Sequence, residues 1–212
     1  MTTSPASLRD RRRRQTEEDI CAAALALFEE HGVAGCTSDD IAAAAGVSSR
    51  TFYRYAVTKE RAALLVQGDI EDAFETGVAA LRPDDPLLPQ LEDLWTEVLR
   101  RHENGRSASG RQLRALYRLM RTEPTLRAAA VVVDDERRAG FAAALAELTG
   151  AAPTDPTPRL LVEITTAVLR VALDRWADAM DAAHDGAPEP DLLALYAEAV
   201  TAFRATTRGL PG

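Results

Sequence analysis

The chain has 212 residues, a net charge of −8 and two cysteines, so it can bury a sizeable core without a disulfide framework. Its three histidines are scattered, and the sequence offers neither a zinc site nor a catalytic metal set. It contains no run of 18 apolar residues and no apolar stretch typical of a signal peptide. These features predict a cytoplasmic protein that does not enter a membrane and carries no metal or cofactor.

Alanine supplies 40 residues, whereas aromatic residues reach only 5%, which favours helix over sheet and predicts an all-α chain. Charge is divided along the sequence. Residues 1–61 hold nine basic and nine acidic side chains, so the whole net charge of −8 lies in residues 62–212. An acidic body is repelled by a polyanion, and the cations at 9–14 and 50–61 are therefore compatible with nucleic acid at one end only.

The first element is expected after a disordered basic arm at residues 1–14. Thr16 is a helix N-cap candidate followed by three acidic residues, and Gly32 is a C′ candidate. A stripe of apolar residues at helical spacing lies between them: Ile20, Ala24, Leu27 and Phe28. The pattern predicts a helix from about residue 16 to His31.

The next stretch, residues 37–55, has the pattern of a helix-turn-helix. Thr37 and Ser48 are each placed to cap a very short helix, and Gly46 supplies the positive φ of the turn between them. Ile41 and Phe52 are the apolar anchors of the two helices. Thr58 is then expected to cap a longer helix over residues 58–80.

The remainder of the chain is expected to be helical with proline-rich interruptions. Pro83, Pro86 and Pro89 form one group of breakers, and residues 151–158 form another. Between and after them the sequence predicts helices at about 89–103, 110–121, 125–149, 158–184 and 190–207. This gives an all-α fold of about nine helices.

A helix-turn-helix places its second helix in the major groove, with short polar side chains near the start of that helix. Ser48, Ser49 and Thr51 fit this role, and Arg50 is able to bind guanine through two hydrogen bonds. Side chains further along are placed to bind phosphates: Tyr53, Arg54, Tyr55 and Lys59. Tyr53 and Tyr55 could instead be core aromatics, and Arg50 a solvated side chain.

The sequence resembles the TetR family of bacterial transcriptional regulators over residues 15–65. The resemblance rests on these motifs: Phe28-Glu-Glu-His-Gly32, Thr37, Asp40-Ile-Ala, Ala45-Gly-Val-Ser48, Thr51-Phe-Tyr-Arg-Tyr55 and Thr58-Lys-Glu60. It implies a DNA-binding head at 15–61, a ligand-binding and dimerisation body at 62–212, and a homodimer. The DNA contacts it implies are Thr37, Ser38, Ser48, Ser49, Arg50, Thr51, Tyr53, Arg54, Tyr55 and Lys59.

Two later segments, 118–127 and 169–176, are similar to a subgroup associated with acyl-CoA-like ligands. A small, largely apolar effector is therefore expected in the body. Candidate pocket residues are apolar or aromatic, with His102 and Tyr117 as polar members: Phe74, Trp95, Leu99, His102, Leu116, Tyr117, Met120, Phe141 and Trp176.

The last two helices carry apolar stripes that favour a homodimer. The stripe residues are Leu160, Leu161, Ile164, Val168, Leu192, Leu195, Tyr196, Ala199, Val200 and Phe203. The family resemblance implies a repressor that binds a pseudo-palindromic double-stranded operator and is released by its effector. The alternatives are an all-α enzyme, for which no nucleophile with its base is present, and a non-specific architectural DNA-binding protein, which a pI of about 5.0 disfavours.

Overall fold

A computed structural model describes residues 8–67, 73–74, 76–101, 107–183 and 190–208. Every regular element in these ranges is a helix, which confirms the expected all-α class. In chain order they are α1 (Leu8–His31), η1 (Val33–Gly35), α2 (Ser38–Ala44), α3 (Ser49–Tyr55), α4 (Lys59–Ala63), η2 (Leu64–Gln67), α6 (Leu87–Arg101), α7 (Ala108–Thr122), α8 (Pro124–Thr149), α9 (Thr157–Ala183) and α10 (Leu192–Arg208).

The chain forms two compact units that each combine separate stretches of sequence. The first unit contains residues 1–68 and 112–133, and the second contains 69–111 and 134–212. Residues 112–133, which the sequence assigned to the body, therefore pack with the N-terminal helices. The boundary between the units passes through α7 and α8, and the described parts of both helices continue across it.

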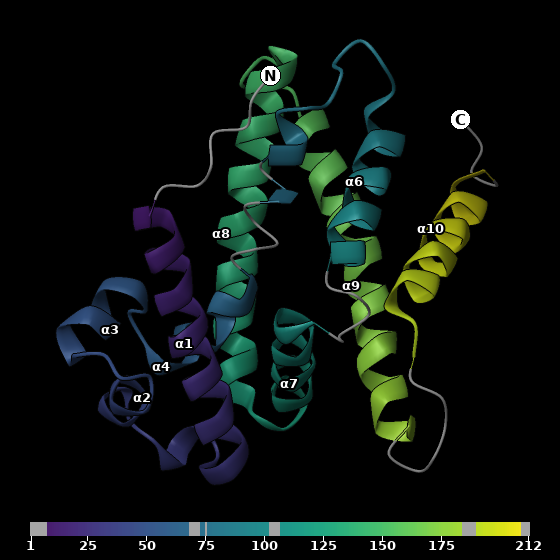
Figure 1. Ribbon diagram of the computed structural model, residues 1–212. Coiled ribbons are helices and arrows are strands. Elements are labelled where there is room, and N and C mark those ends of the chain that lie inside the picture. Colours follow the sequence, from purple (N-terminus) through teal and green to yellow (C-terminus); the bar gives the residue numbers. More distant parts are fainter. Residues whose placement is uncertain (1–7, 68–72, 75, 102–106, 184–189, 209–212) are drawn as a thin grey trace. The chain divides into compact units, whose positions relative to one another are not determined.

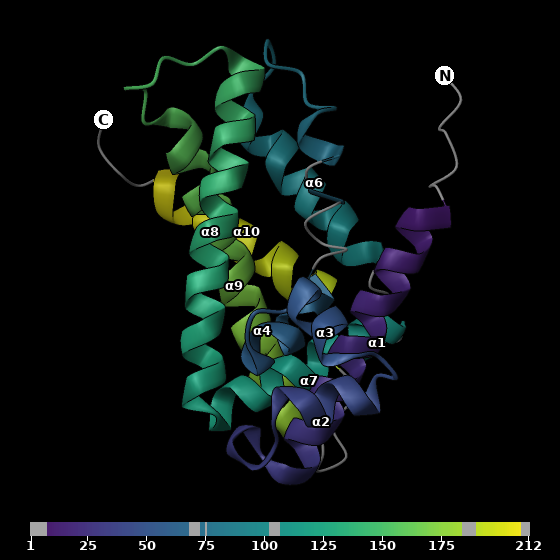
Figure 2. The ribbon, with the colours of Figure 1, turned by 90° about the vertical axis from the view of Figure 1, so that its left-hand side faces the viewer.

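In the first unit, α1 contacts α2 and α4, and α2 contacts α3 (Figures 1 and 2). The core between them is built from apolar side chains that are almost fully buried: Ile20, Cys21, Ala24, Leu25, Phe28, Ile41 and Phe52. Leu27, expected on the buried stripe, is only half-buried. The Arg118 side chain of α7 pairs with Glu29 of α1.

The expected start of the first helix at Thr16 is wrong, because α1 already begins at Leu8. The Thr16 hydroxyl donates to the carbonyl of Arg12 at 2.9 Å and does not cap the helix. Arginine is a good helix former, and Arg13 also pairs with Glu17 one turn later at 3.0 Å. Residues 8–14 of the expected disordered arm are therefore helical, and residues 1–7 lie outside the described residues.

The caps of the short helices follow the sequence. Thr37 and Asp40 form a reciprocal capping box on α2, Ser48 accepts from the amide of Thr51 on α3, and Thr58 accepts from Arg61 on α4. Gly46 has a φ of 67°, the left-handed conformation that the turn requires. Each cap satisfies amides that would otherwise lack an intrahelical partner.

The single helix expected over 58–80 is wrong. It ends at Ala63 and becomes the 3₁₀ helix η2, and helical residues reappear at 73–74 and 76–78. The later helices begin within two residues of their predicted starts. Three prolines occupy first turns, where a missing amide proton costs no hydrogen bond: Pro89 in α6, Pro124 in α8 and Pro158 in α9.

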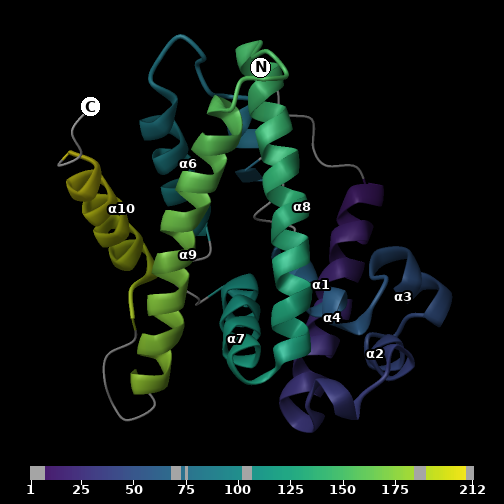
Figure 3. The same ribbon diagram turned by 180° about the vertical axis from the view of Figure 1, so that it is seen from behind.

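In the second unit, α6, α9 and α10 all contact one another (Figure 3). The Glu92 side chain of α6 is buried and pairs with Arg204 of α10. Tyr196 of α10 donates to the backbone carbonyl of Glu92 at 3.4 Å, and burial, with the nearby Glu92 carboxylate, raises the pKa of its phenol. The Arg204 guanidinium offsets part of the cost of desolvating the Glu92 carboxylate.

Candidate nucleic-acid interface

Helix α3 presents a polar, exposed face. Ser48, Ser49, Arg50 and Arg54 are exposed, whereas Phe52 is fully buried and anchors the helix. Tyr53 is 54% exposed, with its ring edge-on to Phe52 at a centroid distance of 5.4 Å. The interpretation of Tyr53 as a core aromatic is therefore wrong.

Tyr55, at the end of α3, is half-buried. The guanidinium carbon of Arg54 lies 5.0 Å from its ring centroid, a cation–π contact that restricts both side chains. Arg54 is exposed, so its guanidinium is also accessible to other partners. These two residues thus form a cationic end to the exposed face.

The N-terminal end of α2 contributes Thr37 and Ser38 to the predicted contacts. The Thr37 hydroxyl donates to Asp40 at 2.7 Å, so its single proton is held within the capping box. The same hydrogen bond, followed by one from the Thr37 amide, lowers the pKa of Asp40. Ser38 is half-buried. A phosphate contact at Thr37 would have to use a group other than this proton.

Two hydrogen bonds fix the serines at the start of α3. The Ser48 hydroxyl lies 3.0 Å from that of Thr51, in addition to capping the helix. The Ser49 hydroxyl donates to the carboxylate of Asp39 on α2 at 2.6 Å. Asp39 was absent from the predicted site, because no local pattern indicates a bond between side chains ten residues apart.

Lys59 has a structural role that the sequence did not predict. Its Nζ donates to the carbonyl of Val33 at 2.6 Å and to that of Cys36 at 3.0 Å. Two of its three protons therefore hold the segment between α1 and α2, and contact with DNA through the third stays a prediction. The same environment buries Cys36, and burial raises the pKa of its thiol.

The predicted effector pocket is divided between the two units. Phe74, Trp95 and Phe141 form an aromatic cluster in the second unit, with centroid distances of 4.4 Å for Phe74–Trp95 and 4.1 Å for Phe74–Phe141. Leu99 and Trp176 are also buried in that unit. In contrast, Leu116, Tyr117 and Met120 belong to the first unit, and His102 lies outside the described residues.

The indole nitrogen of Trp95 is buried without a hydrogen-bond partner among the described residues. A buried donor of this kind is uncommon, because its desolvation is uncompensated. Trp95 therefore remains the member of the predicted pocket with the clearest capacity to bind a ligand acceptor.

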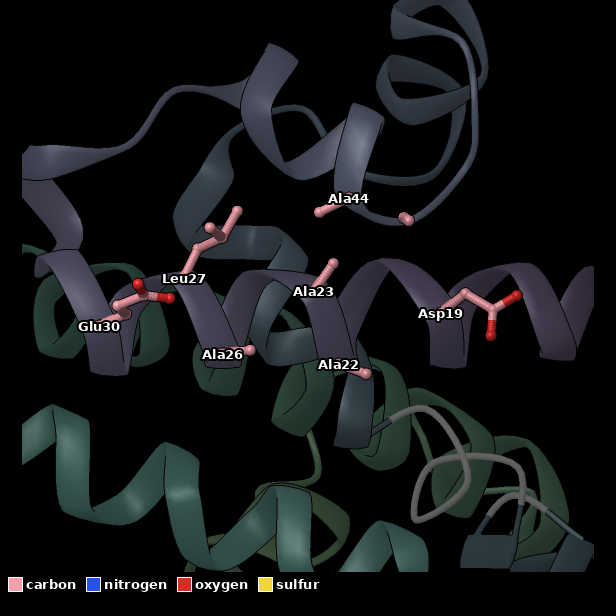
Figure 4. Close-up of a pocket in the computed structure, with 8 residues that line it drawn as sticks. Asp19, Ala22, Ala23, Ala26, Leu27, Glu30 and Ala44 are labelled. Atoms are coloured by element: carbon pink, nitrogen blue, oxygen red, sulfur yellow. The ribbon is translucent and has the colours of Figure 1, made fainter.

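A separate depression of about 400 Å³ lies between α1 and α2 in the first unit (Figure 4). Its lining is mainly alanine, and the side chains of Asp19 and Glu30 lie at opposite ends of it. It lacks convergent polar groups, so it does not resemble a small-molecule site.

Four of the ten predicted interface residues are buried within the second unit itself: Val168, Leu192, Tyr196 and Ala199. The sequence requires some stripe residues to face inward without identifying them, and these four are the ones that do, so they do not belong to a partner surface. Leu160 is exposed, and the other five are half-buried: Leu161, Ile164, Leu195, Val200 and Phe203. Val171 on α9, absent from the prediction, is also exposed.

Within the described parts of the chain, no group of three or more His, Cys, Asp or Glu side chains is arranged to hold a metal ion. None of the described helices combines the length and apolarity needed to cross a bilayer.

The paired short helices, their caps and the exposed face of α3 define a helix-turn-helix DNA-binding protein. Residues 20–62 match the bacterial regulatory proteins of the tetR family, and residues 89–207 match the MftR C-terminal domain. The chain belongs to the TetR family of transcriptional regulators, which confirms the resemblance seen in the sequence.

Two relatives are similar over most of their length. The transcriptional regulator TcmR of Streptomyces glaucescens is 29% identical over 178 residues, covering 82% of this chain and 79% of the relative. The mycofactocin biosynthesis regulator MftR of Mycobacterium tuberculosis is 26% identical over 166 residues, covering 78% of this chain and 82% of the relative. The fatty acid degradation regulator FadR from Bacillus halodurans has the same fold, with a TM-score of 0.51, 18% identity and 94% of both chains covered.

Proposed function

We propose that this regulator is a non-enzymatic cytoplasmic repressor that binds a pseudo-palindromic operator as a homodimer and leaves it when a small, largely apolar effector binds. The observation that carries the proposal is the exposed face of α3. Ser49, Arg50, Tyr53 and Arg54 project from a helix whose opposite side is fixed by the buried Phe52. A helix of this kind fits the major groove.

Within that face, Arg50 has the geometry for base recognition. It lies in the first turn of α3, is exposed, and carries donors that match the O6 and N7 acceptors of guanine. Arg54 lies one turn later, where a phosphate contact would orient the helix without selecting sequence. The two arginines therefore serve as a matched pair for testing.

The homodimer is supported by an apolar stripe on α9. Leu160 and Val171 are exposed, Ile164 and Ala167 are half-buried, and the four are spaced so that they share one face of the helix. An exposed apolar stripe of this length is expected to be covered in solution. A twofold axis would place it against the same stripe of a second copy.

An effector site in the second unit is supported by the aromatic cluster around Phe74 and by the indole nitrogen of Trp95, which has no hydrogen-bond partner in the described part of the chain. A ligand with an apolar chain and a hydrogen-bond acceptor would satisfy both. Acyl-CoA-like compounds, which the sequence resemblance suggests, have this chemistry. Lauroyl-CoA is a suitable probe, with free CoA as the control for the apolar chain.

The test of DNA recognition begins with selection of duplexes from a random pool. The wild-type protein should enrich a palindrome and bind it more tightly than random competitor. Arg50→Ala should relax preference at one base pair per half-site, at a cost of about 1–3 kcal/mol on the selected duplex. Arg54→Ala should weaken all duplexes alike. Absence of any preferred duplex would overturn the proposal.

Effector binding is read from fluorescence. The chain has two tryptophans, so Trp176→Phe leaves Trp95 as the single indole reporter. Lauroyl-CoA should change its emission and weaken operator binding, whereas free CoA should do neither. If lauroyl-CoA leaves both measurements unchanged, this effector class is wrong.

A further inference from the structure

The hydrogen bond between Ser49 and Asp39 joins the two helices of the helix-turn-helix at their N-terminal ends. Ser49 is the first residue of α3, and Asp39 is the second residue of α2. The Ser49 hydroxyl donates to Oδ1 of Asp39 at 2.6 Å, and both residues are exposed. A serine hydroxyl has one proton, so this bond determines which way that proton points.

This hydrogen bond leaves the side chains of Ser49 and Asp39 with only acceptor atoms for further partners. With its proton held by Asp39, the Ser49 oxygen offers lone pairs to any further partner, and a carboxylate also has acceptors only. The next residue, Arg50, has donors only. The start of α3 therefore presents an acceptor group beside a donor group on an exposed surface.

Acceptors discriminate sharply among bases in the major groove. The exocyclic amino groups of adenine and cytosine donate there, whereas guanine presents O6 and N7, and thymine presents O4, all of which are acceptors. Each base pair has one such amino group, so an acceptor at a fixed place in the groove distinguishes the two orientations of a pair. It gains a hydrogen bond where adenine or cytosine faces it and is repelled where guanine or thymine does.

From this geometry we infer that Asp39 is a specificity-determining residue. By orienting the Ser49 hydroxyl, it selects adenine or cytosine at one position of each half-site, in addition to the guanine selected by Arg50. The inference rests on the proposed docking of α3 in the major groove. Asp39 acts partly through Ser49, so it positions one acceptor and supplies another.

A purely structural clamp would behave differently when Asp39 is removed. If Asp39 only held α2 and α3 together, its loss would weaken binding to every duplex. A carboxylate near the phosphates repels all DNA, so its removal should strengthen binding to random DNA while base discrimination falls. The two effects have opposite signs, which separates a role in specificity from a role in folding.

The experiment is duplex selection by the full-length wild-type protein and by Asp39→Ala, with melting temperatures measured in parallel. The wild type should prefer adenine or cytosine at the inferred position by about tenfold. Asp39→Ala should lose that preference, keep the guanine preference of Arg50 and bind random duplexes at least as tightly as the wild type does. Asp39→Asn should narrow the preference to adenine, because an amide matches the adenine N6 and N7 pair.

Glu30→Ala is the matched control, since it removes one exposed carboxylate from α1 of the same unit. It should leave all base preferences unchanged. Ser49→Ala should reduce discrimination at the position that Asp39 affects and nowhere else.

The inference is overturned if Asp39→Ala selects the wild-type sequence, or if it weakens every duplex equally together with a lower melting temperature. Either result leaves the proposed function intact when the wild type still selects a palindrome. Failure of the wild type to select any sequence would instead refute the docking of α3.

Discussion

The Glu123 carboxylate, at the corner between α7 and α8, accepts a hydrogen bond from the amide of Val33 at 3.3 Å. The carbonyl of Val33 accepts in turn from Lys59 at 2.6 Å. Val33 is the first residue of η1, in the link between α1 and α2. Its amide and its carbonyl are thus both bound by side chains from distant parts of the sequence. Glu123 thus stabilises the link between α1 and α2 within the first unit.

Glu123→Ala should lower the free energy of unfolding by about 1–2 kcal/mol, because it leaves the amide of the buried Val33 without a partner. Hydrogen exchange at that amide should accelerate. Glu123→Gln retains an acceptor oxygen and should retain most of the stability. Glu147→Ala, at an exposed position of α8, is the control and should have little effect. Unchanged exchange at Val33 in Glu123→Ala would contradict this role.

Lys59→Ala should destabilise the first unit by about 1.5–3 kcal/mol, because two hydrogen bonds from a charged donor to backbone carbonyls are lost. The slope of log affinity against log salt should stay at its wild-type value, since the ammonium group is engaged within the protein. Arg54→Ala should show the reverse pattern, with normal stability and a slope reduced by about one unit per site. A flatter slope in Lys59→Ala would restore the phosphate contact predicted from sequence.

Thr37→Val should raise the pKa of Asp40 towards its ordinary value, because the threonine hydroxyl is the largest cause of the lowered pKa. A carboxyl whose pKa is lower in the folded state stabilises the protein above its unfolded pKa, and that contribution is lost as pH falls through the folded pKa. The stability difference between wild type and variant should therefore be largest near neutral pH and shrink below about pH 4. Carboxyl NMR titration measures the shift, and an Asp40 pKa that is the same in both proteins would contradict it.

Features set by neighbouring residues could be predicted from the sequence. Thr37, Ser48 and Thr58 cap their helices, and Gly46 makes the turn, because each acts on amides or dihedrals within three residues of itself. The same reasoning failed at Thr16. A threonine ahead of acidic residues resembles a cap, yet its hydroxyl can equally bond the carbonyl four residues back when the preceding arginines are helical.

Features that depend on long-range contacts could not be predicted. Lys59 bonds carbonyls 26 and 23 residues away, and Glu123 bonds an amide 90 residues away. The local sequence around Lys59 does not distinguish a lysine that binds a DNA phosphate from one that binds backbone carbonyls. Phe74, Trp95 and Phe141, three of the pocket candidates, lie together in the second unit, but the apolar pattern alone could not separate them from Leu116 and Met120 of the first unit.

Val171→Glu tests the proposed dimer at a position that is half exposed in the single chain. Val171 is 51% exposed, so the isolated subunit can solvate a carboxylate there and should fold. In a twofold interface the same charge would be buried without a partner and would face its own symmetry copy, which costs several kcal/mol. The variant should sediment as a folded monomer. It should also lose affinity for a full palindrome, because one tethered head no longer raises the effective concentration of the other.

Val132→Glu on α8 is the matched control, with 53% exposure and the same change, and should remain dimeric. The dimer on α9 is wrong if Val171→Glu sediments and binds as the wild type does, or if the wild type is monomeric at micromolar concentration.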